Sequence, residues 1–347
     1  MPVARRALLI VNRTSGTGHE LAVIEKLRGI LAGSLGGRAT LRVETVDDHP
    51  SARSCAAGFL AASETLALVI VGGGSGTLRA VIEGLCEGSP GGRPPGRVLL
   101  GALRMGSGNP LARRFGAPGD PETALRGILD NLEAGRSARC CVMRCEVGTL
   151  GGRSETHYAA TMAGFGQFGR VPGDLERWHR RTSGLRGVIA GLAGIERMNN
   201  VEYILALLIR CASAAVLGRS VVEDVEVRAG MRNERLSLLA GVAMNFPIEE
   251  LPVDPGTQVE EEALSLYLAP FGGRSSALRL VLAPRRAFRS ALRMRIEGQE
   301  RVEIRLLDRD VAEFFLDEDP VTFHGWLRMQ VAGSLAFVPG PGYGVRA

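Results

Sequence analysis

Lysine is nearly absent from this chain of 347 residues, in which Lys26 is the only one and arginine carries the positive charge. Two nucleotide-binding architectures need a lysine at a fixed place. The P-loop needs it in the glycine loop, and the protein-kinase fold needs it on the third strand. Lys26 lies in "VIEKLRGIL", which has the spacing of an amphipathic helix and is remote from every glycine-rich stretch. The sequence therefore excludes both architectures.

Long apolar runs and closely spaced metal ligands are also missing. The longest apolar candidate, "YILALLIRCASAAVLG", carries Arg210 in its middle, and "MPVARRALLIVN" lacks the apolar core and cleavage site of a signal peptide. The histidines form no HxxxH pair, and the cysteines of "CCVMRCEV" lack metal-ligand spacing. We therefore expect a cytoplasmic protein with reduced cysteines and no zinc site.

The charge balance limits the class of partner. The formal net charge is +5, and aromatic residues make up only 5% of the chain. This charge suits an anionic lipid surface or a nucleotide. A nucleic-acid interface is not indicated, because aromatic residues are not interleaved with a basic stripe. The oligomeric state stays open, with a homodimer as one alternative.

The pattern of apolar residues predicts an α/β protein of two domains. Over residues 1–136, strand-like runs such as "ALLIVN" and "LALVIV" alternate with helices, which predicts a parallel three-layer domain with helices on both faces of its sheet. Residues 137–325 contain many short strand-like segments, which predict a mostly antiparallel β-sandwich with a helical insertion at about 175–218. The last strands, in 326–347, are candidates to return toward the first domain.

Glycine-rich loops follow three of the predicted parallel strands: "IVNRTSGTG", "VGGGSGTL" and "LRMGSGNPLARRFGAP". The carboxyl ends of parallel strands meet at one edge of a sheet, where ligands bind. Unpaired backbone N–H groups and a helix N-terminus both attract phosphate. The middle loop does not fit the dinucleotide fingerprint, because Arg79 stands where its third glycine is needed. The loops therefore indicate a phosphate site of another kind.

In order and spacing, these loops resemble the catalytic domain of the diacylglycerol kinase and sphingosine kinase superfamily, and among its members the bacterial lipid kinases. The family pattern reads V-N-P-x-S-G, then G-G-D-G-T, then G-T-G-N-D-x-A-R-x-L-G-I-P. Further along, "EEEALSLYL" is similar to its D-D-G-x-L-D-L, and "AEFFLDEDP" to its L-D-G-E-P. The resemblance implies transfer of the γ-phosphate of ATP, with Mg²⁺, to a hydroxyl of a diacylglycerol-like or sphingoid- or ceramide-like lipid. It also implies a membrane lipid as substrate and peripheral contact with the inner face of the membrane.

The resemblance further implies a role for each matching residue. The ATP-binding residues would be Asn12, Thr45, Gly73, Gly74, Ser75, Gly76, Thr77, Ser107 and Asn109. Glu261 would help to hold Mg²⁺. Asp319, together with Asp317, would form the catalytic pair, with Asp319 as the base. The chemistry agrees, because an alcohol is a poor nucleophile and a carboxylate within hydrogen-bond reach accepts its proton, while a metal and backbone dipoles clamp the γ-phosphate.

Several positions depart from the family pattern. Ser75 and Pro110 replace aspartates, Ala159 replaces an asparagine, Glu262 and Glu318 replace glycines, and Asp319 replaces a glutamate. A neutral hydroxyl at position 75 neither balances Mg²⁺ nor accepts a proton as a carboxylate does. A weakened or inactive pseudokinase that binds nucleotide or lipid in a regulatory role is therefore the alternative. A nicotinamide-dinucleotide kinase, which has a related fold, is a further alternative that "LDEDP" disfavours.

The stretch "DLERWHRRTSGLRGVIAGLAGI" combines arginines and Trp178 with an apolar run. A helix of this kind suits an anionic membrane surface, and a helix that packs between domains fits the same pattern.

Overall fold

In the computed structural model, the described residues are 4–16, 21–62, 64–106, 109–178, 198–248, 251 and 253–344. The amino-terminal part is built on four parallel strands in the order β4-β3-β1-β2. These are β1 (Arg6–Asn12), β2 (Thr40–Val46), β3 (Ala67–Gly73) and β4 (Val98–Arg104). Every residue of β3 is buried, as expected for a central strand with helices on both faces.

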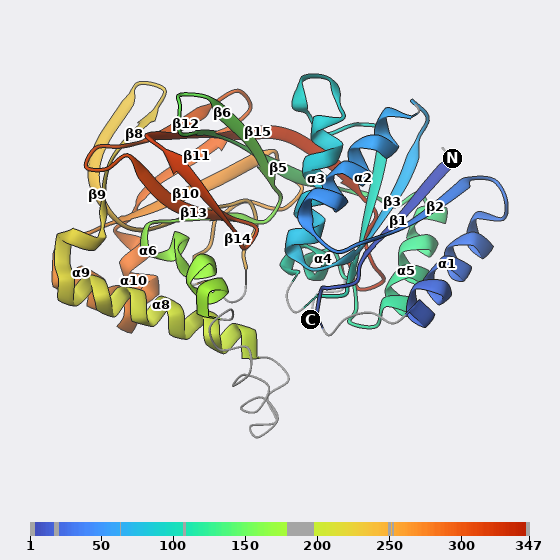
Figure 1. The fold of residues 1–347 in the computed structure, drawn as a ribbon, viewed down its shortest axis with the longest axis horizontal. Coiled ribbons are helices and arrows are strands. Elements are labelled where there is room, and N and C mark those ends of the chain that lie inside the picture. Colours follow the sequence, from blue (N-terminus) through green and yellow to red (C-terminus); the bar gives the residue numbers. More distant parts are fainter. Residues whose placement is uncertain are drawn as a thin grey trace.

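Four helices cover this sheet. Helix α1 (Leu21–Leu35) packs beside α5 (Pro121–Glu133), and α2 (His49–Ala61) packs beside α3 (Ser75–Glu87), so that the two pairs lie on opposite faces (Figure 1). Local sequence signals start two of them. The Asp48 side chain accepts a hydrogen bond from the Ser51 N–H at the start of α2, and Asp120 does the same for Thr123 at the start of α5. The predicted three-layer parallel domain is confirmed.

The remaining strands form a mostly antiparallel sheet, which confirms the second half of the predicted fold class. Its main path runs β14-β13-β7-β9-β8-β12-β15, β10 pairs with β9 and β11, and β5 pairs with β15 and β6. Around a second apolar core lie β5 (Ala138–Gly148), β6 (Ser154–Ala159), β7 (Met162–Phe165), β8 (Glu223–Ala229), β9 (Arg232–Met244), β10 (Ala263–Pro270), β11 (Leu292–Glu297), β12 (Arg301–Leu306), β13 (Val311–Leu316), β14 (Asp319–His324) and β15 (Trp326–Phe337).

Three helices lie along one side of the antiparallel part: α8 (Met198–Leu217), α9 (Arg274–Leu282) and α10 (Pro284–Arg289) (Figure 1). Short helices complete the fold: α4 (Pro110–Arg114), α6 (Gly166–Gly169), η1 (Pro90–Gly92) and η2 (Gly218–Val221). Residues 171–178 are also helical, whereas most of the segment with the membrane-helix pattern lies outside the described residues. Among the helices that the structure describes, none has the length and apolarity needed to cross a membrane.

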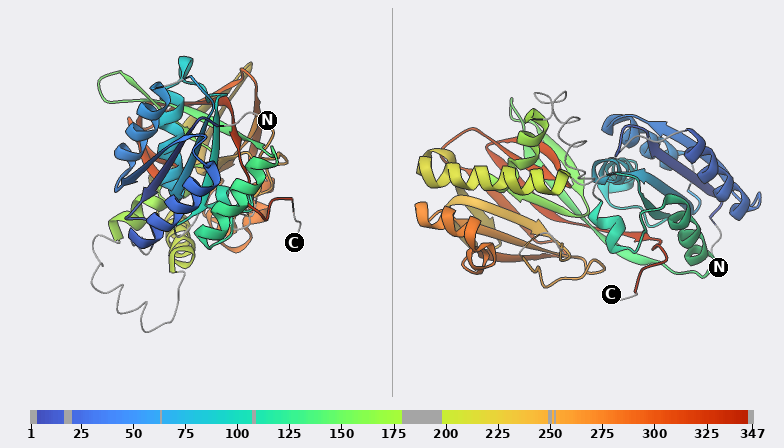
Figure 2. Two further views of the ribbon diagram at one scale, coloured as in Figure 1. Left: turned by 90° about the vertical axis from the view of Figure 1, so that its right-hand side faces the viewer. Right: turned by 90° about the horizontal axis from the view of Figure 1, so that it is seen from below.

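Strand β15 joins the two parts of the molecule. It pairs with β12 and β5 in the antiparallel sheet, and its last residues, Ala336 and Phe337, pair in parallel with Leu99 and Leu100 of β4. Figure 2 shows the strand running from one part into the other. Phe337 then stacks on Phe115 at 4.0 Å between ring centroids. The end of the chain therefore belongs to the core of the amino-terminal part, although the predicted domain boundaries stay predictions.

Candidate functional site

The glycine loop after β3 leads directly into α3. Gly73 ends the strand, and Gly74 is the N-cap residue of the helix in extended conformation, with no side chain to bind the first N–H groups. The loop after β4 contacts it at the backbone, since a Cβ atom on Gly106 would lie 2.4 Å from the Gly74 Cα. Glycine at both positions allows this approach. The N-terminus of α3 is thereby left open to an anion.

The loop after β1 closes against the other two. The Asn12 side chain donates a hydrogen bond of 2.8 Å to the Thr77 hydroxyl and accepts one of 2.9 Å from the Thr14 N–H. The Ser15 hydroxyl donates to the Met105 carbonyl at 2.9 Å. Three loops that are distant in sequence therefore form one edge. They border a cavity of about 300 Å³, which we name the loop cavity.

Six of the residues predicted for the site line the loop cavity: Asn12, Gly74, Ser75, Gly76, Thr77 and Asp319. Asp319 comes from the far end of the chain, as the first residue of β14. A Cβ atom on Gly76 would lie 2.9 Å from Asp319 Oδ1, so the carboxylate lies against the first turn of α3. Beside it, the Ser75 hydroxyl donates a hydrogen bond of 2.5 Å to Glu318. The structure therefore brings the phosphate loop and the acidic turn together.

Asp319 contacts Arg79 and His49, which both also contact the buried Glu83. Arg79, which is 3% exposed, donates to Asp319 Oδ2 at 3.1 Å and to Glu83 at 2.9 Å. His49 contacts Asp319 Oδ2 through Nδ1 at 3.4 Å and Glu83 through Nε2 at 2.8 Å. Both contacts to Asp319 use Oδ2, while Oδ1 is the oxygen nearest Gly76. One carboxylate oxygen is thus anchored and the other faces the helix start.

The same contacts shift two pKa values. Burial disfavours the charged form of His49, but the carboxylates of Asp319 and Glu83 outweigh it and raise the pKa of His49 to about 9. Burial would also raise the pKa of Glu83, yet hydrogen bonds with His157 and His49 and the charge of Arg79 hold that pKa well below its usual range. His49 and Glu83 therefore both stay ionised at neutral pH.

Asp317 has a different position from its predicted partner Asp319. Its buried carboxylate accepts hydrogen bonds of 2.8, 2.8 and 2.9 Å from the backbone N–H groups of Ala160, Thr161 and Met162. Burial raises the pKa of Asp317 to about 6, against the effect of these three bonds. Asp317 and Glu318 both have positive φ, at 47° and 76°. The geometry gives Asp317 the task of holding the turn that presents Glu318 and Asp319.

Three other predicted nucleotide residues do not line the loop cavity. Gly73 packs against Thr77, and the Asn109 side chain caps α4 by accepting from the Ala112 N–H at 3.0 Å. Thr45 is exposed near the end of β2. Ser107 lies outside the described residues. The roles of these four residues in binding ATP stay predictions.

Glu261 lies away from the loop cavity. It is exposed, and its carboxylate pairs with Arg295 on β11 at 3.0 Å, so its metal role stays a prediction without geometric support. Nowhere in the described part of the chain do three or more histidine, cysteine or acidic side chains gather as a metal site. Mg²⁺ commonly uses one or two carboxylates together with substrate phosphates. Beside the loop cavity, the carboxylate of Glu318, which accepts a hydrogen bond from Ser75, is the group that fits that requirement.

The roles of Arg79, Glu83 and His49 were not predicted from the sequence. A signal was present for two of them, because Arg79 and Glu83 are spaced i, i+4 within "LRAVIEGL", where the neighbouring residues are apolar. Two charges on an otherwise apolar helix indicate a buried pair. Nothing local indicated His49, whose partners come from α3 and β14.

Comparison with known proteins supports the family resemblance over part of the chain. Residues 6–139 match the family model of the diacylglycerol kinase catalytic domain, which confirms the resemblance over that part of the chain. A search of curated proteins finds no match. The fold over nearly the whole chain is similar to that of a diacylglycerol kinase from Bacillus anthracis str. Sterne, with a TM-score of 0.60, 14% identity, and coverage of 97% of each chain.

Two further solved structures, each described as a "putative diacylglycerol kinase" from the same organism, superpose with TM-scores of 0.65. Their identities are 15% and 14%; 98% of this chain is covered in both cases, and 96% and 98% of theirs. At these identities the structural similarity shows that the carboxyl-terminal part shares the fold of these proteins, and it shows nothing of its activity.

Proposed function

We propose that this protein is an ATP- and Mg²⁺-dependent lipid kinase that transfers the γ-phosphate to a hydroxyl of a diacylglycerol-like or sphingoid- or ceramide-like lipid. One observation carries the proposal: Asp319 reaches the first turn of α3, against Gly76, from the other end of the chain. A phosphate held at that helix terminus would lie beside a carboxylate, which is the arrangement that phosphoryl transfer to an alcohol requires.

Each part of the loop cavity has a task in this proposal. The open N–H groups of α3 bind phosphate oxygens, and the hydrogen bond between Asn12 and Thr77 fixes the two loops on either side. Asp319 accepts the proton of the lipid hydroxyl through Oδ1, while Arg79 and His49 orient it through Oδ2. Mg²⁺, when bound, would neutralise phosphate charge, and Glu318 is the side chain that would help to hold it.

The proposal includes contact with a membrane, because the lipid acceptor has to be taken from one. We infer a cytoplasmic protein that binds the inner face of the membrane peripherally.

One observation favours a second candidate, a pseudokinase that binds nucleotide without transferring phosphate. Position 75 carries a serine, whose hydroxyl already donates a hydrogen bond to Glu318. If Glu318 blocks the helix start rather than binding metal, nucleotide binds in an unproductive position.

Transfer of labelled γ-phosphate from ATP to a mixed lipid extract, with and without Mg²⁺, tests the proposal. We expect Mg²⁺-dependent labelling of a lipid band, lost in an Asp319→Asn variant. A rise in melting temperature with ATP but no labelled lipid supports the pseudokinase. Labelling of added NAD supports a dinucleotide kinase.

A further inference from the structure

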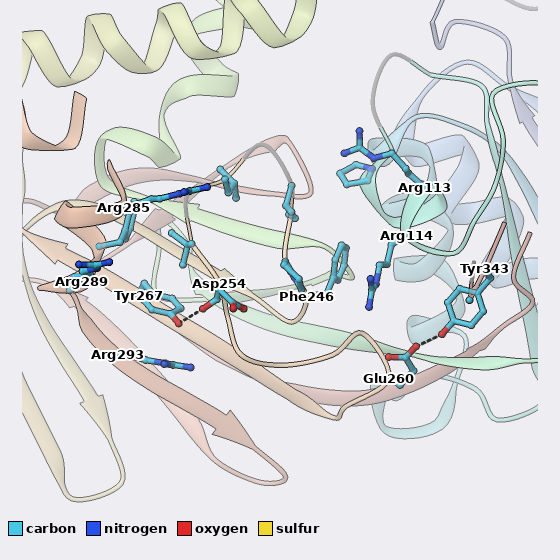
Figure 3. A pocket seen from close by; sticks show the side chains of 18 of the residues that line it. Arg113, Arg114, Phe246, Asp254, Glu260, Tyr267, Arg285, Arg289, Arg293 and Tyr343 are labelled. Carbon is cyan, nitrogen blue, oxygen red and sulfur yellow. Dashed lines mark hydrogen bonds between the residues drawn. The ribbon is translucent and has the colours of Figure 1, made fainter. Parts of the chain in front are cut away.

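A second and larger cavity, of about 1340 Å³, lies between α4 and the end of the chain on one side and α10 and β10 on the other (Figure 3). It shares no lining residue with the loop cavity. None of the residues to which we assign a catalytic task lines it. We name it the arginine cavity, after the five arginines that border it: Arg113, Arg114, Arg285, Arg289 and Arg293.

The arginines stand on two facing walls. Figure 3 shows Arg113 and Arg114 on the wall of the amino-terminal part, and Arg285, Arg289 and Arg293 on the opposite wall. Among the lining residues that the structure describes, the five positive charges face two carboxylates. Of these, Asp254 accepts a hydrogen bond from the Gly256 N–H at 2.9 Å, and Glu260 accepts one from the Tyr343 hydroxyl. The cavity therefore has an excess of positive charge, which attracts an anion.

The guanidinium groups of Arg285 and Arg289 have no partner among the residues that the structure describes. Both are exposed, and neither has a hydrogen bond or ion pair with a residue that the structure describes. By contrast, Arg114 donates to Gln258 at 3.1 Å, and Arg293 donates to the Pro255 carbonyl at 2.9 Å. Arg285 and Arg289 are thus the two groups available to form paired hydrogen bonds with phosphate oxygens.

The lining between the two walls is apolar. Phe246, Ile248 and Val253 are buried side chains that line the cavity, and Leu251 and Phe288 are half-buried beside them. Figure 3 shows Phe246 between the two groups of arginines. An inorganic anion or a sugar phosphate would leave these side chains without a contact. A ligand with a hydrocarbon chain would cover the exposed parts of Leu251 and Phe288, with a gain of about 25 cal/mol per Å² of apolar area removed from water. Phe246, Ile248 and Val253 are already almost fully buried and add little to this gain.

We propose that the arginine cavity binds one molecule of an anionic phospholipid drawn from a membrane. Its phosphate lies against Arg285 and Arg289, and its acyl chain lies along the lining around Phe246. The volume fits this occupant. Pockets for ligands of drug size usually measure about 300–1,000 Å³, and a phospholipid, which is larger than such ligands, needs a larger cavity, as this one is. Pro110 lines this cavity and Gly106 lines the loop cavity, so the bound lipid would lie beside the loop that closes on Gly74.

The proposal does not depend on the kinase activity, because lipid binding is measured without nucleotide. The test is sedimentation of the full chain with vesicles of phosphatidylcholine, and with vesicles that contain phosphatidylglycerol as well. Wild type is expected to bind the anionic vesicles, and the Arg285→Ala/Arg289→Ala variant to bind them on the order of tenfold or more weakly. Equal binding of wild type to both kinds of vesicle overturns the proposal.

A matched control removes the same charge outside the cavity. Arg274 and Arg279 lie on the neighbouring helix α9, are exposed and do not line the cavity. The Arg274→Ala/Arg279→Ala variant is expected to retain binding within about twofold. If it loses as much as the cavity variant, the attraction belongs to the general surface charge and the proposal is wrong. Melting temperatures of both variants check that the fold is kept.

Two further measurements separate phospholipid from a smaller anion. The Arg285→Lys/Arg289→Lys variant keeps the charge and loses the planar fork, so we expect binding between those of wild type and the alanine variant. Inorganic phosphate, titrated by calorimetry, is expected to bind at least about 100-fold more weakly than a short-chain phosphatidylglycerol, because it leaves the apolar lining uncovered. Equal affinity would assign the cavity to a free phosphate.

Discussion

The Ser75 hydroxyl donates a hydrogen bond of 2.5 Å to the Glu318 carboxylate, across a separation of 243 residues in sequence. One residue lies at the start of α3 and the other in the turn before β14. The two parts of the chain that the proposed reaction needs are therefore in direct contact. The contact also places a carboxylate beside position 75, where the side chain itself has none.

The first prediction concerns this pair. A Ser75→Asp variant puts two carboxylates within hydrogen-bond distance, so we expect the free energy of unfolding to fall by about 1–2 kcal/mol in the absence of divalent cations. A Glu318→Gly change relieves the repulsion and suits the φ of 76° at that position. Urea unfolding of the two single variants and the double variant is expected to give a coupling energy of about 1 kcal/mol or more. Additive effects would mean that the two side chains do not meet.

The second prediction concerns the buried ion pair of α3. Arg79→Met removes the nearest guanidinium partner of Glu83, which is 1% exposed, and leaves His49 and the more distant Arg53 as cationic partners. Breaking a buried pair in this way costs about 3–5 kcal/mol, and thermal or urea unfolding measures it. Arg28→Met is the control, because Arg28 pairs with Glu25 on an exposed helix surface and such pairs contribute under about 1 kcal/mol. Similar losses in the free energy of unfolding of the two variants would contradict the description of Arg79 and Glu83 as a buried ion pair.

The third prediction follows from His49. Its pKa is about 9 in the folded protein, against 6.5 for a histidine without these partners, so the folded state binds more protons between these values. This contribution to stability is fully present below pH 6.5 and is lost as the pH rises toward 9. We expect the free energy of unfolding to fall by roughly 1–3 kcal/mol over that window.

The His49→Gln variant isolates the contribution of His49. Its stability is expected to decrease less between about pH 6.5 and 8.5 than that of wild type. The difference between the two curves removes the contribution of buried cysteines such as Cys86, whose pKa is raised by burial. Asp317, whose raised pKa is about 6, contributes mainly below this window. Parallel curves for wild type and the variant would mean that His49 does not interact with Asp319 and Glu83 as described.

Local patterns were sufficient for much of the fold. Apolar runs followed by glycine loops identified the parallel sheet, because a buried strand and the turn after it are determined over a few residues. The motif near the carboxyl terminus also directed attention to Asp319, which lines the loop cavity. The predicted strands did not include β11 or β14, since "LRMRIE" and "DPVTFH" carry charges or a proline within the run.

The contacts that organise the site were beyond the reach of local patterns. Glu261 pairs with Arg295 only because β10 and β11 are neighbours in the sheet. The bonds of Asp317 to the β6–β7 connection join residues 155 to 157 positions apart. Such pairs depend on how strands register after the chain has folded, and a single sequence carries little information on that register.

The most direct test of the central claim compares wild type with an Asp319→Asn variant in two measurements on the same samples: binding of MgATP by calorimetry, and initial rates of phosphate transfer to lipid. The asparagine side chain has the shape of the aspartate that it replaces, but it does not accept a proton from the lipid hydroxyl. We predict MgATP affinity within about threefold of wild type and a transfer rate lower by roughly 10²-fold or more. A variant that transfers phosphate as fast as wild type would contradict the account.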